Sequence, residues 1–262
     1  MSLGMKKMRP RVIPVLLLSG DGLVKTVRFD EPKYIGDPIN AMKIFNDSEV
    51  DELILLDITS GRNGQPPAWG QLSEIISEAF MPVTYGGAVR EFSQAEKLFQ
   101  MGVEKIAFNT ASFSSPGLLE KTAHVYGNQS VVASIDVKKN FWGRYEAFVD
   151  YGRKPTKVAP VDYARRMEEF GAGEILLNSI DRDGTRTGYD LDVIQQVSQA
   201  VSVPVVACGG AHELKDFHRA IYGAGASAVA AGSMFVFHGK LRGVLINYPR
   251  PAELRELFQS PV

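Results

Sequence analysis

Short apolar runs rich in valine, isoleucine and leucine alternate along the chain with amphipathic stretches of helical period. The amphipathic stretches include residues 37–50, 92–101, 161–170 and 191–201. Near-continuous apolar strands that alternate with helices indicate a parallel sheet covered by helices. The apolar runs begin near Arg11, Leu53, Pro82, Lys105, Ser130, Glu174, Pro204 and Ala226. Eight such units in about 250 residues favour an α/β fold with a single (β/α)8 TIM barrel over the alternative, an open doubly wound sheet.

The two halves of the chain resemble each other. Pro82-Val83-Thr84-Tyr85-Gly86-Gly87-Ala88 recurs as Val205-Val206-Ala207-Cys208-Gly209-Gly210-Ala211, which Pro204 precedes. In the same way, Glu52-Leu53-Ile54-Leu55 recurs as Glu174-Ile175-Leu176-Leu177. The offset is about 120 residues in both cases, which indicates two similar half-barrels fused in one chain. Such a repeat predicts two similar sites on opposite sides of the barrel mouth.

Composition and charge narrow the class of protein. The 262 residues are 45% hydrophobic and 23% charged, as in a soluble globular protein, and no proline-rich linker interrupts them. We therefore expect one barrel over residues 11–262, preceded by a disordered or tag-derived N-terminus at residues 1–10. A net charge of -1 gives no general attraction to nucleic acid or to an anionic membrane. A single cysteine argues against disulfides and against a multi-cysteine zinc site. Without a signal peptide or a run of about 18 apolar residues, a cytoplasmic location is expected.

Two glycine pairs, Gly86-Gly87 and Gly209-Gly210, each follow a predicted strand and precede a helix. Without a Cβ atom, the backbone N–H groups there can approach an anion closely, and the helix N-terminus adds a favourable partial charge. Each pair is in register with a second strand end that is small or polar, which favours phosphate sites over simple turns. A ligand with two separated phosphates is expected. The candidate phosphate-binding residues are Gly86, Gly87, Asn109, Thr110, Gly184, Gly209, Gly210, Gly232 and Ser233.

A carboxylate, Asp136, ends the predicted fifth strand, on the face where barrel enzymes carry their catalytic groups. A general acid or base is expected there, and a solvated loop carboxylate is the alternative. Asp57 ends strand two and Asp183 follows strand six on the same face, although the run around Asp183 also suits a turn. The repeat predicts a partner for Asp136 at the end of strand one, but Leu17 stands there. A leucine cannot exchange a proton.

Several motifs occur in one order along residues 11–258. They are Gly22-Leu23-Val24-Lys25, Leu56-Asp57-Ile58-Thr59, Phe108-Asn109-Thr110-Ala111, Ile180-Asp181-Arg182-Asp183-Gly184-Thr185 and Gly188-Tyr189-Asp190-Leu191. Together they resemble the cyclase subunit family of imidazole glycerol phosphate synthase. The resemblance implies a heterodimer with a glutaminase subunit, whose ammonia travels through the barrel to a bisphosphorylated ribonucleotide. The products in that family are imidazole glycerol phosphate and an aminoimidazole carboxamide ribotide.

The resemblance also assigns roles to single residues. In the family, two aspartates at the ends of strands one and five carry the acid–base work. Asp136 matches the second of them, and Leu17 stands in place of the first. Lys25 matches a family lysine on the first loop, so Asp136, Lys25 and Asp183 are the catalytic candidates. Ala88 stands where the family usually has a third glycine.

Four charged residues, Arg11, Glu52, Lys105 and Glu174, open strands one, two, four and six. They match the charged ring that forms the ammonia entrance in the family. Two cations and two anions at strand starts can neutralise one another around a narrow opening, whereas the alternative, ordinary surface ion pairs, contributes little.

Two further segments, Ile13-Pro14-Val15-Leu16-Leu17-Leu18 and Phe235-Val236-Phe237-His238-Gly239, resemble a branch of the family linked to acetamidino-sugar formation. The resemblance implies that ammonia passes to a separate sugar amidotransferase that makes lipopolysaccharide precursors. Three alternatives remain. One is an active cyclase of histidine biosynthesis in which Asp57 or Asp183 replaces the missing aspartate. The others are a related sugar-phosphate isomerase and a non-catalytic scaffold that activates the glutaminase.

Other features predict little chemistry. The four histidines lack metal-ligand spacing, so neither a metal nor a cofactor is expected. Cys208 lies in an apolar strand and is expected in the core rather than as a nucleophile. Residues 138–153 form the longest non-helical segment before strand six and predict a hairpin or lid.

Overall fold

Eight parallel strands close into a barrel in the computed structural model, which describes residues 9–239 and 242–259. They are β1 (Arg11–Ser19), β4 (Leu53–Asp57), β5 (Val83–Gly86), β6 (Lys105–Phe108), β7 (Val131–Lys139), β10 (Glu174–Ser179), β11 (Val205–Cys208) and β12 (Ala228–Ala231). Each strand pairs with the next one along the chain, and β12 closes the ring on β1, with Arg11 opposite Ala228. The predicted barrel is confirmed, and this closure excludes the open doubly wound sheet.

The strands read as near-continuous apolar runs because both of their faces are buried. On β1, Val12 and Leu16 pack into the layer between the strands and the helices, whereas Ile13 and Val15 belong to a cluster inside the barrel. This alternation follows from the two-residue period of a strand. The inner cluster consists of Ile13, Val15, Ile54, Ala107, Val132, Leu176, Val206, Cys208, Ala228 and Ala230, with Leu17 and Leu56 packed against it.

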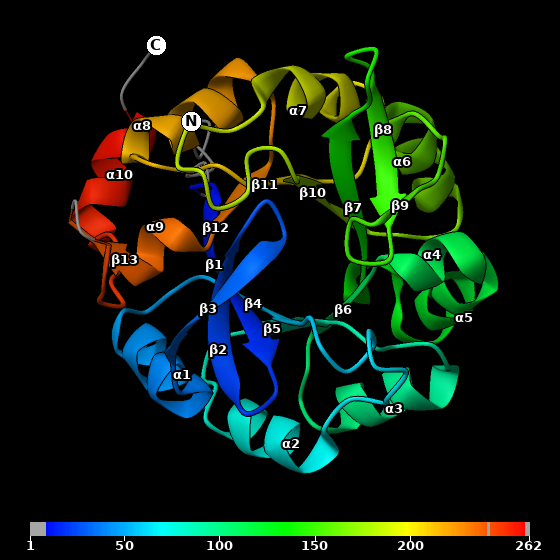
Figure 1. The fold of residues 1–262 in the computed structure, drawn as a ribbon, viewed down its shortest axis with the longest axis horizontal. Helices are drawn as coiled ribbons and strands as arrows, with labels where there is room; N and C mark the ends of the chain where they lie inside the picture. Colours follow the sequence, from blue (N-terminus) through cyan, green and yellow to red (C-terminus); the bar gives the residue numbers. More distant parts are fainter. Residues whose placement is uncertain (1–8, 240–241, 260–262) are drawn as a thin grey trace, which may run out of the picture.

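Helices surround the ring of strands (Figure 1). They are α1 (Pro38–Asp47), α2 (Trp69–Ser77), α3 (Phe92–Gln100), α4 (Thr110–Ser114), α5 (Pro116–Tyr126), α6 (Pro160–Glu169), α7 (Leu191–Ser198), α8 (Leu214–His218), α9 (Ser233–Val236) and α10 (Pro251–Gln259). A 3-10 turn (Asn128–Ser130) and a π turn (Arg219–Gly223) complete the helical segments of the described chain. Helix α1 begins as predicted, because the Asp37 side chain accepts a hydrogen bond from the Asn40 backbone N–H at 2.8 Å.

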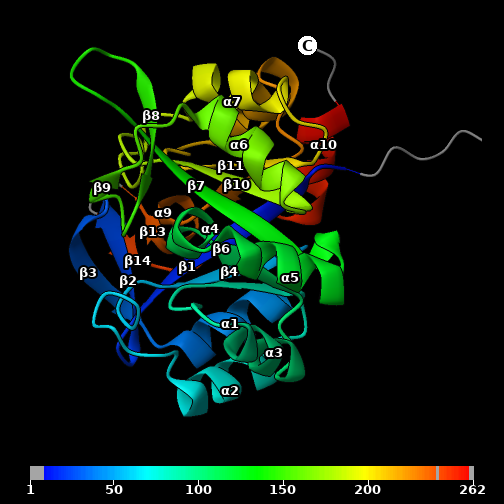
Figure 2. The same ribbon diagram turned by 90° about the vertical axis from the view of Figure 1, so that its right-hand side faces the viewer.

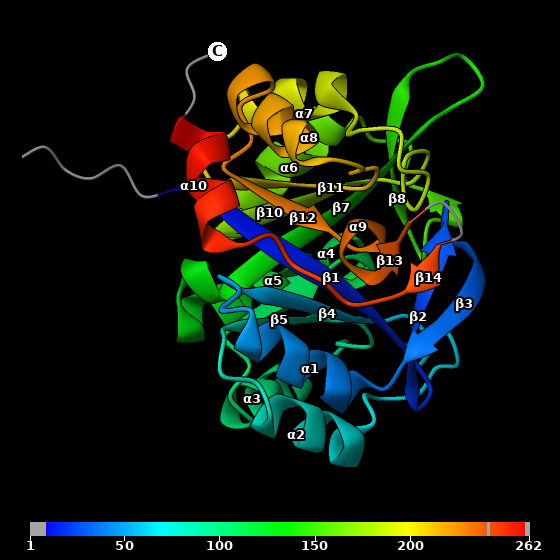
Figure 3. The same ribbon diagram turned by 90° about the vertical axis from the view of Figure 1, so that its left-hand side faces the viewer.

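Two antiparallel ribbons extend from the same end of the barrel (Figures 2 and 3). The first joins β2 (Gly22–Val27) to β3 (Asp30–Gly36) and pairs with the end of β1. The second joins the end of β7 to β8 (Tyr145–Val149) and the short β9 (Lys154–Pro155), which confirms the hairpin predicted for residues 138–153. A third small pair, β13 (Phe237–His238) with β14 (Gly243–Val244), precedes α10.

The chain ends of the described region are tied to the barrel. Residues 1–8 of the expected N-terminal tail lie outside the described residues, whereas Arg9 forms an ion pair with Asp51 at 2.8 Å. Tyr248, just before α10, donates a hydrogen bond to the Val12 carbonyl of β1 at 2.8 Å. No helix within residues 9–239 and 242–259 is long and apolar enough to cross a membrane.

Candidate active site

A cavity of about 380 Å³ opens at the carboxyl ends of the barrel strands. Every catalytic and phosphate-binding residue expected from the sequence lines it: Lys25, Asp136, Asp183, Gly86, Gly87, Asn109, Thr110, Gly184, Gly209, Gly210, Gly232 and Ser233. Leu17 and Asp57 also face this space. The residues lie on the eight barrel strands, in the segments that directly follow these strands, or on β2 of the β2–β3 ribbon, so only barrel closure brings them together.

Asp136 lies on β7 near the mouth of the barrel and is buried, with 7% of its surface exposed. The Asn109 side-chain amide donates a hydrogen bond to its Oδ2 atom at 3.2 Å. Burial, and secondarily the charge of Asp183, raises the pKa of Asp136 to about 7. The alternative of a solvated loop carboxylate is therefore wrong, and this carboxyl group can hold or release a proton near neutral pH.

Lys25 reaches the cavity from β2, and its ammonium group donates a hydrogen bond to the Val15 carbonyl. Burial lowers the pKa of Lys25 to about 8, and the charge of Asp183 opposes this shift. Burial also raises the pKa of Asp183, whose carboxylate accepts a hydrogen bond from the Thr26 hydroxyl at 3.2 Å. Gly232 makes room for the lysine, because a Cβ atom there would lie 2.1 Å from Nζ.

Each of the two glycine loops, residues 86–88 (the first-half loop) and 209–211 (the second-half loop), contains a glycine whose backbone conformation other residues cannot adopt without a clash. Gly87 has a φ of +117°, and a Cβ atom there would lie 2.2 Å from the Asp57 carbonyl oxygen. Gly210 has a φ of +107°, and its Cβ atom would lie 2.3 Å from the Gly188 carbonyl oxygen. Ala88 has a φ of +58°, a conformation that costs an alanine roughly 1 kcal/mol.

The cavity wall on the strand-one side is apolar. Leu17 lines it together with Val15 and Leu56, and Leu17 pairs with Leu56 across the β1–β4 ladder. Cys208 belongs to the inner cluster, as expected, and burial raises the pKa of its thiol to about 12, so the thiolate is strongly disfavoured. Asn178 completes this region, and its buried Oδ1 atom has no hydrogen-bond partner among the described residues.

Asp57 has a local structural role. Its Oδ1 atom accepts hydrogen bonds from the backbone N–H groups of Thr59 and Ser60, each at 2.9 Å. The Tyr85 hydroxyl lies 3.5 Å from Oδ2. Because these contacts fix the loop after β4, Asp57 is better placed to shape the first half of the cavity than to transfer a proton.

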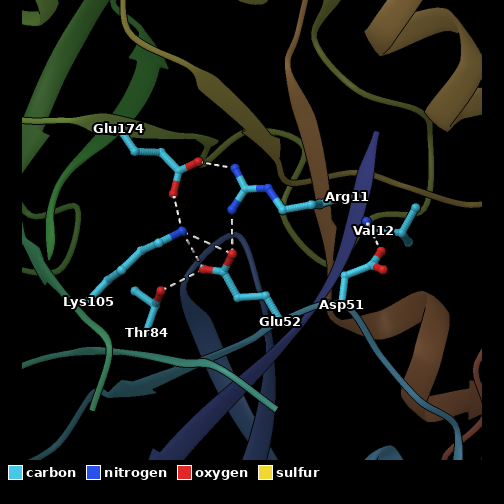
Figure 4. Close-up of polar contacts among 7 residues, drawn as sticks. All are labelled: Arg11, Val12, Asp51, Glu52, Thr84, Lys105 and Glu174. Carbon is cyan, nitrogen blue, oxygen red and sulfur yellow. Dashed lines mark hydrogen bonds and ion pairs between the residues drawn. The ribbon is translucent and has the colours of Figure 1, made fainter. Parts of the chain in front are cut away.

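The four charged strand-start residues form a closed ring at the opposite end of the barrel (Figure 4). Lys105 contacts Glu52 at 3.0 Å and Glu174 at 2.9 Å, and Arg11 pairs with both glutamates. The Thr84 hydroxyl donates a further hydrogen bond to Glu52 at 2.7 Å. The side chains of Glu52 and Glu174 are only 4% and 7% exposed. The two glutamates are therefore buried and paired with both cations, unlike the carboxylates of ordinary surface ion pairs.

Sequence reasoning missed several cavity residues, among them Arg62, Arg90, Tyr151 and Asn178. Arg62 and Tyr151 lie in loops whose course only the closed barrel reveals. Arg90 could have been found from the internal repeat, because Glu213 occupies the equivalent position after the second-half loop. A basic residue that replaces an acidic one beside a phosphate loop marks a difference between the two halves.

A family model described as histidine biosynthesis protein matches residues 11–242. The chain is 52% identical over 241 residues to a Pseudomonas aeruginosa protein provisionally named imidazole glycerol phosphate synthase subunit hisF2, which covers 92% of this chain and 96% of the relative. It is 38% identical over 228 residues to the imidazole glycerol phosphate synthase subunit HisF of Alkaliphilus metalliredigens, which covers 87% and 90%. The chain therefore belongs to the histidine biosynthesis protein family, and these HisF subunits are its relatives.

Proposed function

We propose that the protein is a cyclase-like subunit of the imidazole glycerol phosphate synthase type that delivers ammonia rather than closing an imidazole ring. In this role, a glutaminase subunit docks on the barrel floor and releases ammonia through the ring of Arg11, Glu52, Lys105 and Glu174. The ammonia then leaves for a partner amidotransferase that amidinates a sugar nucleotide. The cavity at the mouth holds a phosphorylated molecule between the two glycine loops.

The observation that carries this proposal is the apolar side chain of Leu17 in the cavity that contains Asp136. Ring closure in this family needs two carboxyl groups, one to donate and one to accept a proton. This cavity offers Asp136 with a pKa of about 7, but a methyl-rich wall at the end of strand one. A positioned acid or base contributes on the order of 100-fold or more, so its loss suppresses turnover without disturbing the barrel.

The test is steady-state turnover of the bisphosphorylated ribonucleotide with an ammonium salt, followed by loss of its absorbance. Wild type is expected to be inactive, and Leu17→Asp is expected to gain activity. Leu17→Asn is the matched control, because it has the size of aspartate but cannot exchange a proton. Turnover by the wild type would refute the proposal, as would equal activity of the two variants.

The second candidate function is an active cyclase of histidine biosynthesis, favoured by the position of Asp183. This carboxylate is buried, lines the cavity and lies within electrostatic reach of Lys25. It is a better replacement for the missing aspartate than Asp57, whose oxygens already hold the loop after β4. This candidate predicts wild-type turnover that is lost in Asp183→Asn and in Asp136→Asn.

A scaffold without ligand chemistry makes a different prediction. If the protein only activated the glutaminase, Ser233→Ala would leave glutamine-dependent amidination unchanged. Under the leading proposal the same change weakens ligand binding at the second-half loop, because Ser233 lines that side of the cavity. The two readings are separated by measuring glutaminase activation and amidination on the same variant.

A further inference from the structure

The first-half loop carries two arginines that have no carboxylate partner. Arg62 and Arg90 both line the cavity, and neither takes part in an ion pair within the described part of the chain. The protein as a whole has a slight excess of acidic residues, with a net charge of -1. Unpaired guanidinium groups that converge on a cavity are the usual arrangement for an anionic ligand.

Arg90 stands two residues beyond the first-half loop and is held by a single contact. Its Nη2 atom donates a hydrogen bond to the Gly61 carbonyl at 2.6 Å. No other protein partner of its guanidinium group occurs among residues 9–239 and 242–259. Since a guanidinium carries five N–H donors in a rigid fork, most of them are left for a bound oxyanion.

Arg62 is positioned by an aromatic side chain. Its Cζ atom lies 5.1 Å from the centre of the Tyr151 ring, a cation–π contact that leaves the N–H edge of the guanidinium without a protein acceptor. Tyr151 is in turn seated against Gly61, where a Cβ atom would lie 2.1 Å from the tyrosine oxygen and 3.2 Å from the Ala88 backbone nitrogen. Gly61 therefore links both arginines to the first-half loop.

The second half of the barrel does not repeat this arrangement. In the internal repeat, Gly184 takes the place of Arg62 and Glu213 takes the place of Arg90. At Gly184 a side chain is excluded, because a Cβ atom there would lie 2.2 Å from the Thr26 carbonyl oxygen. Arg186 and Lys25 line the cavity near the second-half loop, and the charge of Lys25 is balanced in part by Asp183. Arg182 packs against Gly210 of the same loop, but its guanidinium group donates to the carbonyl and hydroxyl oxygens of Thr187 and does not line the cavity.

We propose that Arg62 and Arg90 bind the ligand directly and make the first-half loop selective for a dianionic phosphate monoester. Two free guanidinium groups match the two charges of such a group, whereas a singly charged phosphodiester leaves one charge unmatched. The difference between the halves then fixes the direction in which an elongated phosphorylated molecule lies across the mouth. This inference specifies which ligand group the first-half loop binds. It rests on the proposed function in one respect, that a phosphorylated molecule occupies the cavity.

The test is a titration of the full-length protein with methyl phosphate at pH 8 and constant ionic strength, followed by the backbone amide NMR signals. Gly87 reports on the first-half loop and Gly210 on the second. Dimethyl phosphate, which carries a single charge, is the matched probe. The affinity reported by Gly87 is expected to be about tenfold or more higher for methyl phosphate, because charge-assisted hydrogen bonds are the strongest available.

The variants locate the effect. Arg62→Gln and Arg90→Gln should each lower the methyl phosphate affinity at Gly87 by about tenfold and leave the Gly210 response unchanged. Arg165→Gln is the matched control, because the Arg165 guanidinium, on α6, donates to the Ala200 carbonyl at 3.3 Å and does not line the cavity. Unchanged affinity in the Arg62→Gln, Arg90→Gln double variant would overturn the inference, and so would equal affinity of the wild type for both probes. Since the titration involves no ammonia transfer, its failure is distinguishable from failure of the proposed function.

Discussion

Replacement of Asp136 by asparagine should change how the free energy of unfolding depends on pH. In the folded protein, burial raises the pKa of this carboxyl group to about 7, whereas its ordinary value is 3.8. The folded state therefore retains a proton that the unfolded chain releases as pH rises. The stability that this group contributes is fully present below its ordinary pKa and is lost as pH rises through about 7.

The size of the effect follows from the shift. One pKa unit corresponds to about 1.4 kcal/mol. Because the pKa of Asp136 is higher in the folded protein than in the unfolded chain, the free energy of unfolding of the wild type is about 3 kcal/mol lower at pH 8 than at pH 5 from this group alone. Asparagine keeps the shape of the side chain and never charges. Asp136→Asn should therefore gain about 3 kcal/mol relative to the wild type between these two pH values.

Urea unfolding followed by far-UV circular dichroism at both pH values measures this difference. Asp192→Asn, which changes an exposed carboxylate on α7, is the control for the general effect of an amide substitution. A difference between Asp136→Asn and the wild type that stays constant from pH 5 to pH 8 would refute the argument. It would show that the carboxyl group is charged throughout that range.

Three further changes test the packing of the two barrel ends. Glu52→Gln should lower the free energy of unfolding by about 3 kcal/mol, because it leaves Arg11 and Lys105 with one shared carboxylate, Glu174, in place of two. An unchanged urea midpoint would contradict this. Gly210→Ala should lower the melting temperature and abolish stabilisation by phosphate, because a Cβ atom there meets the Gly188 carbonyl oxygen. Gly64→Ala is the control: Gly64 also has a positive φ but has open space around it, so this change should lower the free energy of unfolding by only about 1 kcal/mol. Ala88→Gly should raise the free energy of unfolding by about 0.5 kcal/mol, since relief of its positive φ outweighs the added freedom of the unfolded chain; a loss in urea unfolding would contradict it.

Much of the fold was accessible from the sequence because its signals are local and repeated. The apolar runs that begin at Arg11, Leu53, Lys105 and Glu174 start strands at those residues, since a strand buried on both faces must be continuously apolar. The glycine loops could also be predicted from the sequence, because each contains a glycine pair at the end of a strand, where the backbone leaves no room for a Cβ atom.

Other parts of the site depend on distances that no local pattern encodes. The approach of Tyr151 to Gly61 joins two loops from different quarters of the ring, and neither flanking sequence signals the contact. The shifted pKa values of Lys25 and Asp136 arise from burial, which exists only after closure. The buried, unpaired oxygen of Asn178 likewise had no sequence signature.

The pairing of β12 with β1 has a consequence for how the protein is made. One edge of β1 pairs with β4, but the other edge pairs with β12, which ends at Ala231 and is the last barrel strand to be synthesised. During synthesis, the growing chain therefore carries unpaired strand edges on both sides of an open sheet, a form prone to associate with other chains. The pairing of Arg11 with Ala228, and of Pro14 with Ala231, forms only after β12 has been synthesised. A chain that stops before β12 therefore lacks both the closed barrel and the part of the cavity wall formed by Ala231, Gly232 and Ser233.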